Sequence, residues 1–354
     1  MGQGDRGQGS TAQGSTAQGS TTQVIVGAGT IGTALARRLA ADGRTVKLVS
    51  RRGTGPDVAG VEAVAADATD GAALAAVCRG AGVVYNCANP SSYAKWATQW
   101  PPMATAILAA AESAGAVLVT LSNLYGYGPP TGPMTEDLPL AAPGRKGRIR
   151  AEMWADALAA HRAGRVRVTE ARASDYFGPG FTDTAHMGSR VVPRVLKGKT
   201  VHTIGHPDVA HSWSYVDDVV ETLVALGREP SAWGRAWHVP SGEPHTQRQM
   251  VEAFAAAAGV AAPAVAGIPG LVLRAAGVVS PLIRELGEVR YQFDRPFVLD
   301  ATDAETAFGL RATDFDEAVA ATVAWWRRRA TADTAAGAPT RAAAGKAPGT
   351  ATAA

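Results

Sequence analysis

Residues 23–32 read QVIVGAGTIG, an apolar run followed by three glycines at fixed spacing. The run predicts a buried strand, and Gly27, Gly29 and Gly32 follow it in a Gly-x-Gly-x-x-Gly pattern that opens a helix. Gly27 permits a tight turn, Gly29 lets a ligand approach the backbone, and Gly32 lets helix and strand pack closely. With the helix amides at Thr30 and Ile31, the stretch predicts a cradle for the pyrophosphate of a dinucleotide. A glycine turn without a ligand is the plainer alternative.

Outward from this strand, short β-branched runs alternate with Ala-rich helical stretches. The pattern predicts strands at 45–49, 61–65, 83–86, 117–121 and 166–170, and helices at 33–41, 72–78, 103–114 and 148–162. Apolar strands separated by helices are typical of a parallel sheet covered on both faces. Right-handed crossovers then favour an α/β fold of Rossmann type, with a doubly wound parallel sheet.

The regular alternation ends near Gly180. Beyond it the segments are richer in His, Trp and Pro, with helices predicted at 216–226 and 316–328. We expect a Rossmann domain over residues 23–180, completed by parts of 212–240 and 295–329. A smaller C-terminal substrate lobe would be built from 181–211 and 241–294. The polar composition of residues 1–22 and 330–354 predicts a flexible leader and a flexible tail.

Length and composition limit the class of protein. The chain has 354 residues, 46% of them hydrophobic, and a formal charge of +3, which is too small to indicate a nucleic-acid partner. Its two cysteines, Cys78 and Cys87, have no partner at metal-ligand spacing, so no metal site is predicted. A reduced, cytoplasmic setting fits this cysteine usage best. No apolar stretch has the length of a signal sequence core or a membrane span, so we expect a soluble protein without a membrane partner.

The end of the second predicted strand distinguishes NAD from NADP. An acid about 20 positions after the glycines would accept the ribose 2′-hydroxyl. This strand instead ends in Ser50, Arg51 and Arg52. A hydroxyl and two guanidiniums suit a 2′-phosphate, so NADP(H) is favoured over NAD(H) as the cofactor. The alternative explanation is a pair of solvated surface arginines.

These features resemble the extended short-chain dehydrogenase/reductase superfamily, of the NAD-dependent epimerase/dehydratase type. The shared landmarks occur in the family's order at residues 27–32, 67–70, 86–89, 127–128, 172 with 178–179, and 215–218. The resemblance implies that Asp67, with Ala68 beside it, binds the adenine amino group. It also implies that Ala88, Asn89 and Pro90 pass beside the nicotinamide ribose. It is compatible with a homodimer held through two helices of each subunit.

At the family's active site this sequence departs from the resemblance. Members use a Ser/Thr hydroxyl, a proton-transferring Tyr, and a Lys four residues later whose charge lowers the phenol pKa. Aligned on the family's landmarks, Ser122 falls beside the hydroxyl position and Asn123 falls on it. Gly144 and Arg148 take the positions of the Tyr and the Lys. The usual base is therefore missing, which makes the chain an atypical member.

Tyr125 is the leading substitute for the missing base. It belongs to the loop after the fifth strand, which faces the nicotinamide in this fold, and Lys146 and Arg148 are expected near enough to lower its pKa. Asn123 would polarise a carbonyl, and Tyr127 is the alternative phenol. A Tyr125 that only packs, with its hydroxyl bonded, stays an open alternative.

The substrate candidates are aromatic and imidazole side chains. His211 stands where nucleotide-sugar members carry the Arg that binds the substrate diphosphate. Because a neutral imidazole is a weak diphosphate ligand, this residue argues against a nucleotide sugar. His211 would instead donate to a carbonyl or hydroxyl, or it is a satisfied buried histidine. Tyr93, Tyr127 and His186 are the further candidates, either as the wall of an apolar pocket or as ordinary core.

The sequence therefore predicts an enzyme, namely an NADP(H)-dependent oxidoreductase acting on a small carbonyl, alcohol or activated alkene. Hydride would pass at the nicotinamide, with Tyr125 as acid or base and with Lys146 and Arg148 as electrostatic support. Two alternatives stay open. One is a nucleotide-sugar epimerase or dehydratase, and the other is a protein that binds NADP(H) without catalysis.

Overall fold

The structure is a computed structural model that describes residues 22–90 and 92–336. At its centre lies a parallel sheet built from β1 (Thr22–Val26), β2 (Val46–Ser50), β3 (Val61–Ala65), β4 (Ala81–Asn86), β5 (Val117–Asn123), β6 (Arg167–Ala173) and β10 (Ala236–His238). These seven strands lie in the order β10-β6-β5-β4-β1-β2-β3. The chain reverses its direction of travel across the sheet between β1 and β4. This is the doubly wound, Rossmann-type sheet that the sequence predicts.

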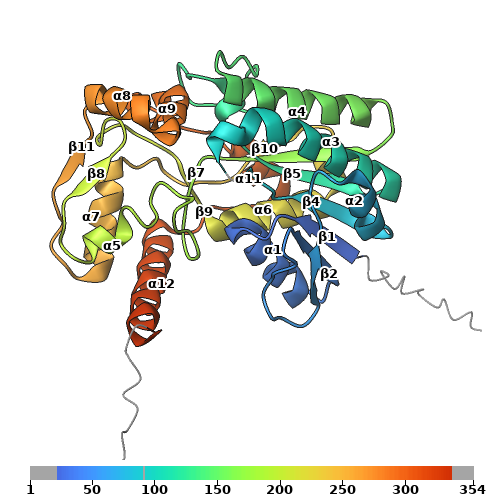
Figure 1. The fold of residues 1–354 in the computed structure, drawn as a ribbon, viewed down its shortest axis with the longest axis horizontal. Helices are drawn as coiled ribbons and strands as arrows, with labels where there is room; N and C mark the ends of the chain where they lie inside the picture. The colour runs from blue at the N-terminus through green and yellow to red at the C-terminus, as the bar shows by residue number, and fades with distance from the viewer. Residues whose placement is uncertain (1–21, 91, 337–354) are drawn as a thin grey trace, which may run out of the picture.

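Helices cover both faces of this sheet (Figure 1). On one face lie α2 (Gly71–Cys78), α3 (Trp96–Ala114) and α4 (Arg145–Arg162), and on the other lie α1 (Thr30–Ala41) and α6 (Val216–Arg228). Strands covered on both sides need apolar residues in succession. Val24 and Ile25 meet this requirement, since both are fully buried and belong to the two different clusters on opposite faces.

A smaller lobe stands beside the sheet (Figure 1). It contains two short strand pairs, β7 (Asp175–Phe177) with β9 (Trp213–Tyr215) and β8 (Val201–Thr203) with β11 (Val265–Gly267). Its helices are α5 (Val192–Val195), α7 (Gln247–Ala258), α8 (Gly270–Val279), α9 (Pro281–Leu286) and α10 (Tyr291–Asp294). Short 3-10 turns are η1 (Tyr93–Lys95), η2 (Tyr125–Tyr127), η3 (Pro230–Ala232) and η4 (Gly287–Val289).

The last two helices, α11 (Thr302–Phe308) and α12 (Phe315–Ala336), differ in what they contact. Helix α11 packs on β10 of the main sheet, whereas α12 packs on α7 and α5 of the lobe. The reason is the apolar stripe of α12, where Val319 and Val323 join the cluster that contains Phe254 of α7. The stretch 295–329, expected to complete the Rossmann domain, therefore contributes to both parts.

The predicted flexible ends fall largely on residues 1–21 and 337–354, which lie outside the described residues. At the two borders the structure differs from the expectation. Thr22 already belongs to β1, and residues 330–336 continue α12 instead of starting a tail.

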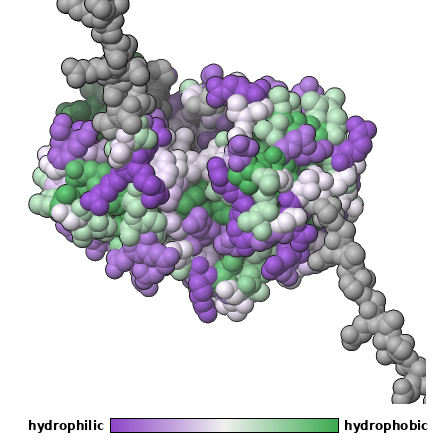
Figure 2. All heavy atoms as spheres, turned by 90° about the horizontal axis from the view of Figure 1, so that it is seen from below, coloured by the Kyte–Doolittle hydropathy of each residue, from purple (hydrophilic) through white to green (hydrophobic). Residues whose placement is uncertain are grey.

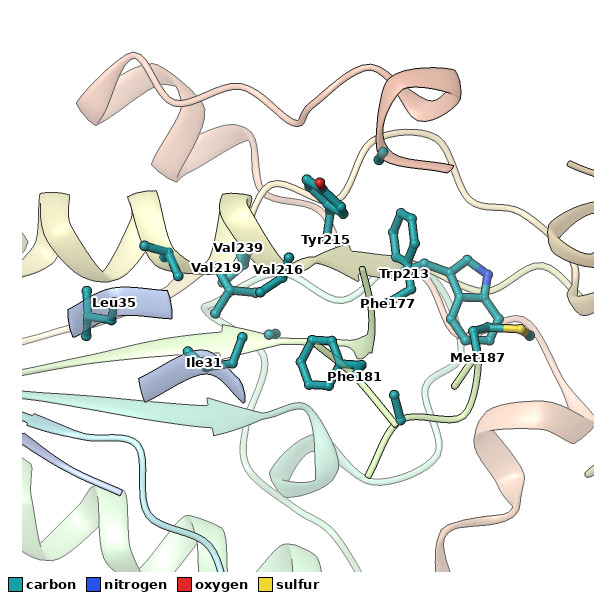
Figure 3. Packing of buried hydrophobic residues seen from close by; sticks show 14 of the residues in the cluster. Ile31, Leu35, Phe177, Phe181, Met187, Trp213, Tyr215, Val216, Val219 and Val239 are labelled. Carbon is teal, nitrogen blue, oxygen red and sulfur yellow. The ribbon is translucent and has the colours of Figure 1, made fainter. Parts of the chain in front are cut away.

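One apolar cluster runs from the sheet into the lobe (Figure 3). Ile31 and Leu35 of α1 lie near Val219 of α6, and Phe181 and Trp213 continue the cluster toward the lobe. All five side chains are buried. A shared core of this kind fixes the lobe relative to the carboxyl ends of the strands, where the site lies.

The surface shows hydrophobic and hydrophilic residues interspersed on the face seen in Figure 2. Exposed large hydrophobic side chains gather on α8, where Leu271, Val272, Val278 and Val279 are each more than half exposed. Within the described ranges, no helix has the length and apolar character needed to cross a bilayer.

Candidate functional site

The glycine stretch forms the turn from β1 into α1. Gly27 has a φ of +113°, and a Cβ there would lie 2.6 Å from the backbone of Cys87, so this position requires glycine. A Cβ at Gly32 would collide with the carbonyl oxygen of Gly27. Gly29 is different, because it has an ordinary φ of −78° and a Cβ there would meet no atom within 4 Å. Open space beside Gly29 is what a bound phosphate group needs.

The first turn of α1 directs amides at that open space. The first hydrogen bond of the helix runs from Thr33 N to Gly29 O at 2.9 Å, so the amides of Thr30 and Ile31 have no acceptor within the helix. No side chain caps this end. The Thr30 hydroxyl donates to Gly180 O at 3.1 Å and closes one side of the turn. This arrangement fits the pyrophosphate of a dinucleotide.

The predicted adenosine end lies at the ends of β2 and β3. Arg51 and Arg52 are exposed there, and the Ser50 hydroxyl accepts a hydrogen bond from Thr54 N at 3.0 Å. Asp67 accepts hydrogen bonds from Thr69, and these bonds, aided by the charge of Arg51, hold the pKa of Asp67 below its usual range. Ala68 follows it and is half-buried. The two guanidiniums and the carboxylate thus share one edge of the sheet.

A cleft of about 330 Å³ lies between the glycine turn and the lobe. Its walls include ten residues expected at the site: Gly29, Thr30, Ile31, Gly32, Ala88, Asn89, Tyr93, Ser122, Asn123 and Tyr125. They meet because they follow β1, β4 and β5, neighbouring parallel strands whose carboxyl ends share one edge of the sheet. Pro90 is buried next to this wall in the sequence but does not line it.

Two phenols face each other in this cleft. The hydroxyls of Tyr93 in η1 and Tyr125 in η2 lie 2.8 Å apart, and the Trp96 ring stacks 6.0 Å from that of Tyr125. We expected nearby cations to lower the pKa of Tyr125. Instead, burial raises it well above its ordinary value, and the neighbouring Tyr93 adds to the rise. A phenol with so high a pKa keeps its proton at neutral pH and is a weak acid, so its hydroxyl is suited to donate a hydrogen bond.

Helix α4 turns a different face to the cleft from the one implied by the alignment. Gly147 packs against the Tyr125 backbone, where a Cβ would collide with the carbonyl oxygen. Lys146 and Arg150 lie four residues apart on this side and are 1% and 7% exposed. Arg148 is exposed and donates to the carbonyl oxygen of Pro143. The structure therefore does not bring Arg148 to Tyr125.

Lys146 is engaged by two carboxylates. Its ammonium lies 2.6 Å from Glu285 Oε2 and 3.0 Å from Glu288 Oε2, and 5.5 Å from the centroid of the Tyr93 ring. The two glutamates follow α8 in the lobe, so the ammonium ties the first turn of α4 to α9 and η4. Much of its charge is balanced by these carboxylates, which limits its effect on the phenols.

Lys146→Met is expected to lower the free energy of unfolding by roughly 1–3 kcal/mol, because Glu285 and Glu288 lose a buried cation. The hydrogen bond from Lys146 holds the pKa of Glu285 below its usual value. This stabilisation is therefore present above the ordinary carboxyl pKa and is lost as the pH falls through the lowered one. Thermal unfolding at neutral and acidic pH measures it, with exposed Lys95→Met as the control. Equal unfolding of Lys146→Met and wild type at neutral pH would contradict the assignment.

His211 lies behind the cleft and is 1% exposed. Its Nε2 lies 2.9 Å from Asp175 Oδ2 and its Nδ1 lies 3.2 Å from Gln292 O. Both ring nitrogens therefore lie within hydrogen-bond distance of groups of the protein itself. Burial favours a raised pKa for Asp175, but the hydrogen bond and charge of His211 hold it below the usual range. The imidazole is thus engaged within the fold and directs no nitrogen at a diphosphate.

Tyr127 and His186 do not line the cleft. The Tyr127 hydroxyl accepts a hydrogen bond from Arg172 Nη1 at 2.7 Å and lies 2.8 Å from His238 Nε2, within a buried polar network. His186 donates from Nε2 to Gln247 Oε1 at 2.5 Å and faces a second pocket.

This second pocket has a volume of about 940 Å³ and lies in the lobe. Its walls combine apolar side chains with the carboxylates of Glu288 and Asp294 and with five arginines: Arg190, Arg274, Arg284, Arg290 and Arg295. Of these, Arg290 is paired with Asp294 at 3.0 Å. Tyr291 lines this pocket and the next residue, Gln292, lines the cleft, so the pocket adjoins the cleft. Clustered guanidiniums favour an anionic ligand.

The profile of the NAD dependent epimerase/dehydratase family matches residues 24–239, from β1 through the end of β10. The chain belongs to this family. No protein with a curated description matches the sequence. Family membership agrees with the resemblance found in the sequence.

Solved structures share this fold. MoeE5 in complex with UDP-glucuronic acid and NAD superposes with a TM-score of 0.72 at 23% identity, covering 87% of this chain and 99% of that one. UDP-glucose 4-epimerase of Thermotoga maritima gives 0.72 at 17% identity, with 88% and 100% covered. dTDP-glucose 4,6-dehydratase of Bacillus anthracis with NAD gives 0.73 at 18% identity, with 87% and 97% covered.

The two charged side chains of the cleft, Arg150 and Asp175, were not among the predicted site residues. Arg150 has a recognisable sequence signal, since it follows Lys146 by four residues, the spacing of one helix face. The alignment with the family pointed to Arg148 instead. Asp175 gives no such signal, because only the pairing of β7 with β9 brings it beside His211. The arginines of the second pocket are spread over residues 190–295 and share no spacing.

Proposed function

We propose that the protein is an NADP(H)-dependent enzyme that transfers hydride at a carbon of a phosphorylated substrate such as a nucleotide sugar. The observation that carries this proposal is the adjacency of two sites. A dinucleotide-type glycine turn and a phenol pair share one cleft, and an arginine-lined pocket of about 940 Å³ adjoins it. The names of the solved relatives, which include a UDP-glucose epimerase and a dTDP-glucose dehydratase, support the same substrate class.

The residues of the cleft fit such a cofactor. The amides of Thr30 and Ile31 would hold its pyrophosphate, Asp67 its adenine, and Arg51 and Arg52 its 2′-phosphate. When bound, the cofactor supplies a nicotinamide that accepts or donates a hydride. The neutral phenols of the Tyr93–Tyr125 pair would hydrogen-bond to the substrate oxygen, and proton transfer from Tyr125 during reduction requires that the bound cofactor and substrate lower its pKa.

The arginine-lined pocket favours a nucleotide sugar as substrate over a small carbonyl, alcohol or activated alkene. The sequence argued against a nucleotide sugar because His211 replaces a diphosphate-binding arginine. In the structure, Arg190, Arg274 and Arg284 line the pocket without an ion pair to any described carboxylate within 4 Å. They offer the positive charge that His211 lacks.

A small carbonyl, alcohol or activated alkene is the second candidate substrate. The cleft itself, about 330 Å³ and walled by Tyr93, Trp96 and Phe181, favours it, because a small apolar molecule fills such a space without contacting the arginines of the second pocket. Calorimetric titration with UDP-glucose and dTDP-glucose distinguishes the two classes. Binding of either supports the nucleotide sugar, whereas NADPH oxidation with small aldehydes or enones and no sugar-nucleotide binding supports the second candidate.

Replacing Arg51 and Arg52 by Ala is expected to weaken NADPH binding about tenfold or more and to leave NADH binding unchanged, because only NADPH carries the 2′-phosphate. Nicotinamide fluorescence measures both dissociation constants. Arg79→Ala, at the exposed end of α2, is the matched control. Wild-type protein that binds NADH more tightly than NADPH would remove the NADP assignment and leave the rest of the proposal standing.

A further inference from the structure

Arg150 lies in the wall of the cleft with unsatisfied donors. It is 7% exposed, and its Nε and Nη1 are buried without a hydrogen-bond acceptor among the described residues. Its Cζ lies 4.2 Å from the ring centroid of Trp100 and 5.0 Å from that of Trp96. The indole rings lie against the guanidinium, and the side chain still lines the cleft.

No described carboxylate lies within ion-pair distance of this cation. Glu170 attracts it, but the Glu170 carboxylate already accepts a hydrogen bond from Arg172 Nε at 2.7 Å. A buried and unpaired cation is costly, and contacts with indole rings offset only part of that cost. Neutralising the positive charge of Arg150 therefore requires an anion that the described residues do not provide.

Further donors face the same cleft. The Tyr93–Tyr125 pair uses one hydroxyl proton between its two oxygens, and the Tyr125 hydroxyl also has Gln292 as a partner, so the Tyr93 hydroxyl is the phenol donor left for a ligand. Asn123 uses its Oδ1 to accept from Tyr125 N at 3.1 Å, which leaves its side-chain NH₂ as a donor. Guanidinium, phenol and amide N–H together form a donor set of the kind that binds an oxyanion.

We propose that Arg150 binds a carboxylate of the substrate, so that the substrate is a carboxylic acid whose reacting carbon lies beside the Tyr93–Tyr125 pair. This inference rests on the proposed function and narrows its substrate class. A ribose hydroxyl or a neutral carbonyl would use the N–H groups but would leave the positive charge unbalanced. Phosphate groups already have the amides of α1 and the arginine-lined pocket, whereas a planar carboxylate matches the guanidinium edge.

The first test compares two probes that differ by a carboxylate, UDP-glucuronic acid and UDP-glucose, by calorimetry on the full chain saturated with NADP⁺. We expect UDP-glucuronic acid to bind at least about tenfold more tightly to the wild type, and Arg150→Met to abolish this preference. Arg162→Met, an exposed position near the end of α4, is the matched control and should keep it. Equal binding of both probes to the wild type would overturn the inference and leave the nucleotide-sugar proposal intact.

If neither UDP-sugar binds, the nucleotide-sugar proposal fails and the carboxylate site is tested by itself. Benzoate and benzamide have the same shape, and only benzoate is charged at neutral pH. Titration followed by tryptophan fluorescence, which Trp96 and Trp100 report, should show tighter binding of benzoate to the wild type and no difference for Arg150→Met. Equal response to both compounds would overturn the inference.

Thermal unfolding separates ligand binding from a structural role. Because Arg150→Met removes an uncompensated buried charge and keeps similar volume, its melting temperature should equal or exceed that of the wild type. Arg150→Lys keeps the charge but loses the planar fork and should retain only part of the carboxylate preference. A lower melting temperature together with unchanged carboxylate preference would assign Arg150 to packing alone and overturn the inference.

Discussion

Gly29→Val is expected to abolish cofactor binding while leaving the fold intact. The backbone at Gly29 has an ordinary φ, and an added side chain would meet no atom of the protein within 4 Å. The same side chain would occupy the space next to the amides of Thr30 and Ile31, where the pyrophosphate is proposed to lie. We expect NADPH affinity to fall about 100-fold or more with little change in melting temperature.

Gly71 supplies the matched control for this experiment. It also stands at the start of a helix, α2, with no atom within 4 Å of an added Cβ. Gly71→Val should bind NADPH like the wild type. Gly32→Val, in contrast, should lose stability as well, since its side chain collides with the carbonyl oxygen of Gly27. Normal NADPH binding by Gly29→Val would show that the turn serves only the fold.

Tyr125→Phe is expected to lower kcat about 100-fold or more, within the usual range for removal of a general acid. The phenol lies in the cleft 2.8 Å from the Tyr93 hydroxyl, and burial raises its pKa, so it is protonated at neutral pH. Its loss also removes the hydrogen bond that orients Tyr93. The NADPH dissociation constant should stay unchanged, since no cofactor contact is proposed for this hydroxyl.

Steady-state rates on whichever substrate is turned over, together with NADPH titration, measure this effect. Tyr215→Phe is the control, a buried phenol of β9 that does not line the cleft. Unchanged turnover in Tyr125→Phe would exclude the phenol from proton transfer and favour its packing role. It would leave the cofactor site unaffected, because that site depends on the glycine turn.

Local patterns in the sequence were sufficient to predict the parallel sheet and the glycine turn. The strand pattern and the spacing of Gly27, Gly29 and Gly32 depend on neighbours in the chain, and the fold has the predicted doubly wound sheet. The start of α3 was predicted at Met103, directly after Pro101 and Pro102. The helix begins earlier, at Trp96, and includes both prolines, since burial of Trp96 and Trp100 outweighs the lost backbone hydrogen bonds.

The surroundings of Tyr125 in the cleft depend on contacts between distant segments of the chain. Local sequence patterns do not predict such contacts. Lys146 was expected to act on Tyr125, but Glu285 and Glu288, about 140 residues later, balance its charge. The guanidinium of Arg150 lies against the rings of Trp96 and Trp100, which belong to another helix. Such pairings follow from tertiary packing, so the structure was needed to choose between Arg148 and Arg150.

Nicotinamide dinucleotide binding at the turn after β1 underlies every functional proposal for this protein. Equilibrium titration of the full chain with NADPH, followed by nicotinamide fluorescence, measures this binding. We expect saturable binding of one equivalent per chain. Absence of saturable binding by NADPH and by NADH alike would contradict it.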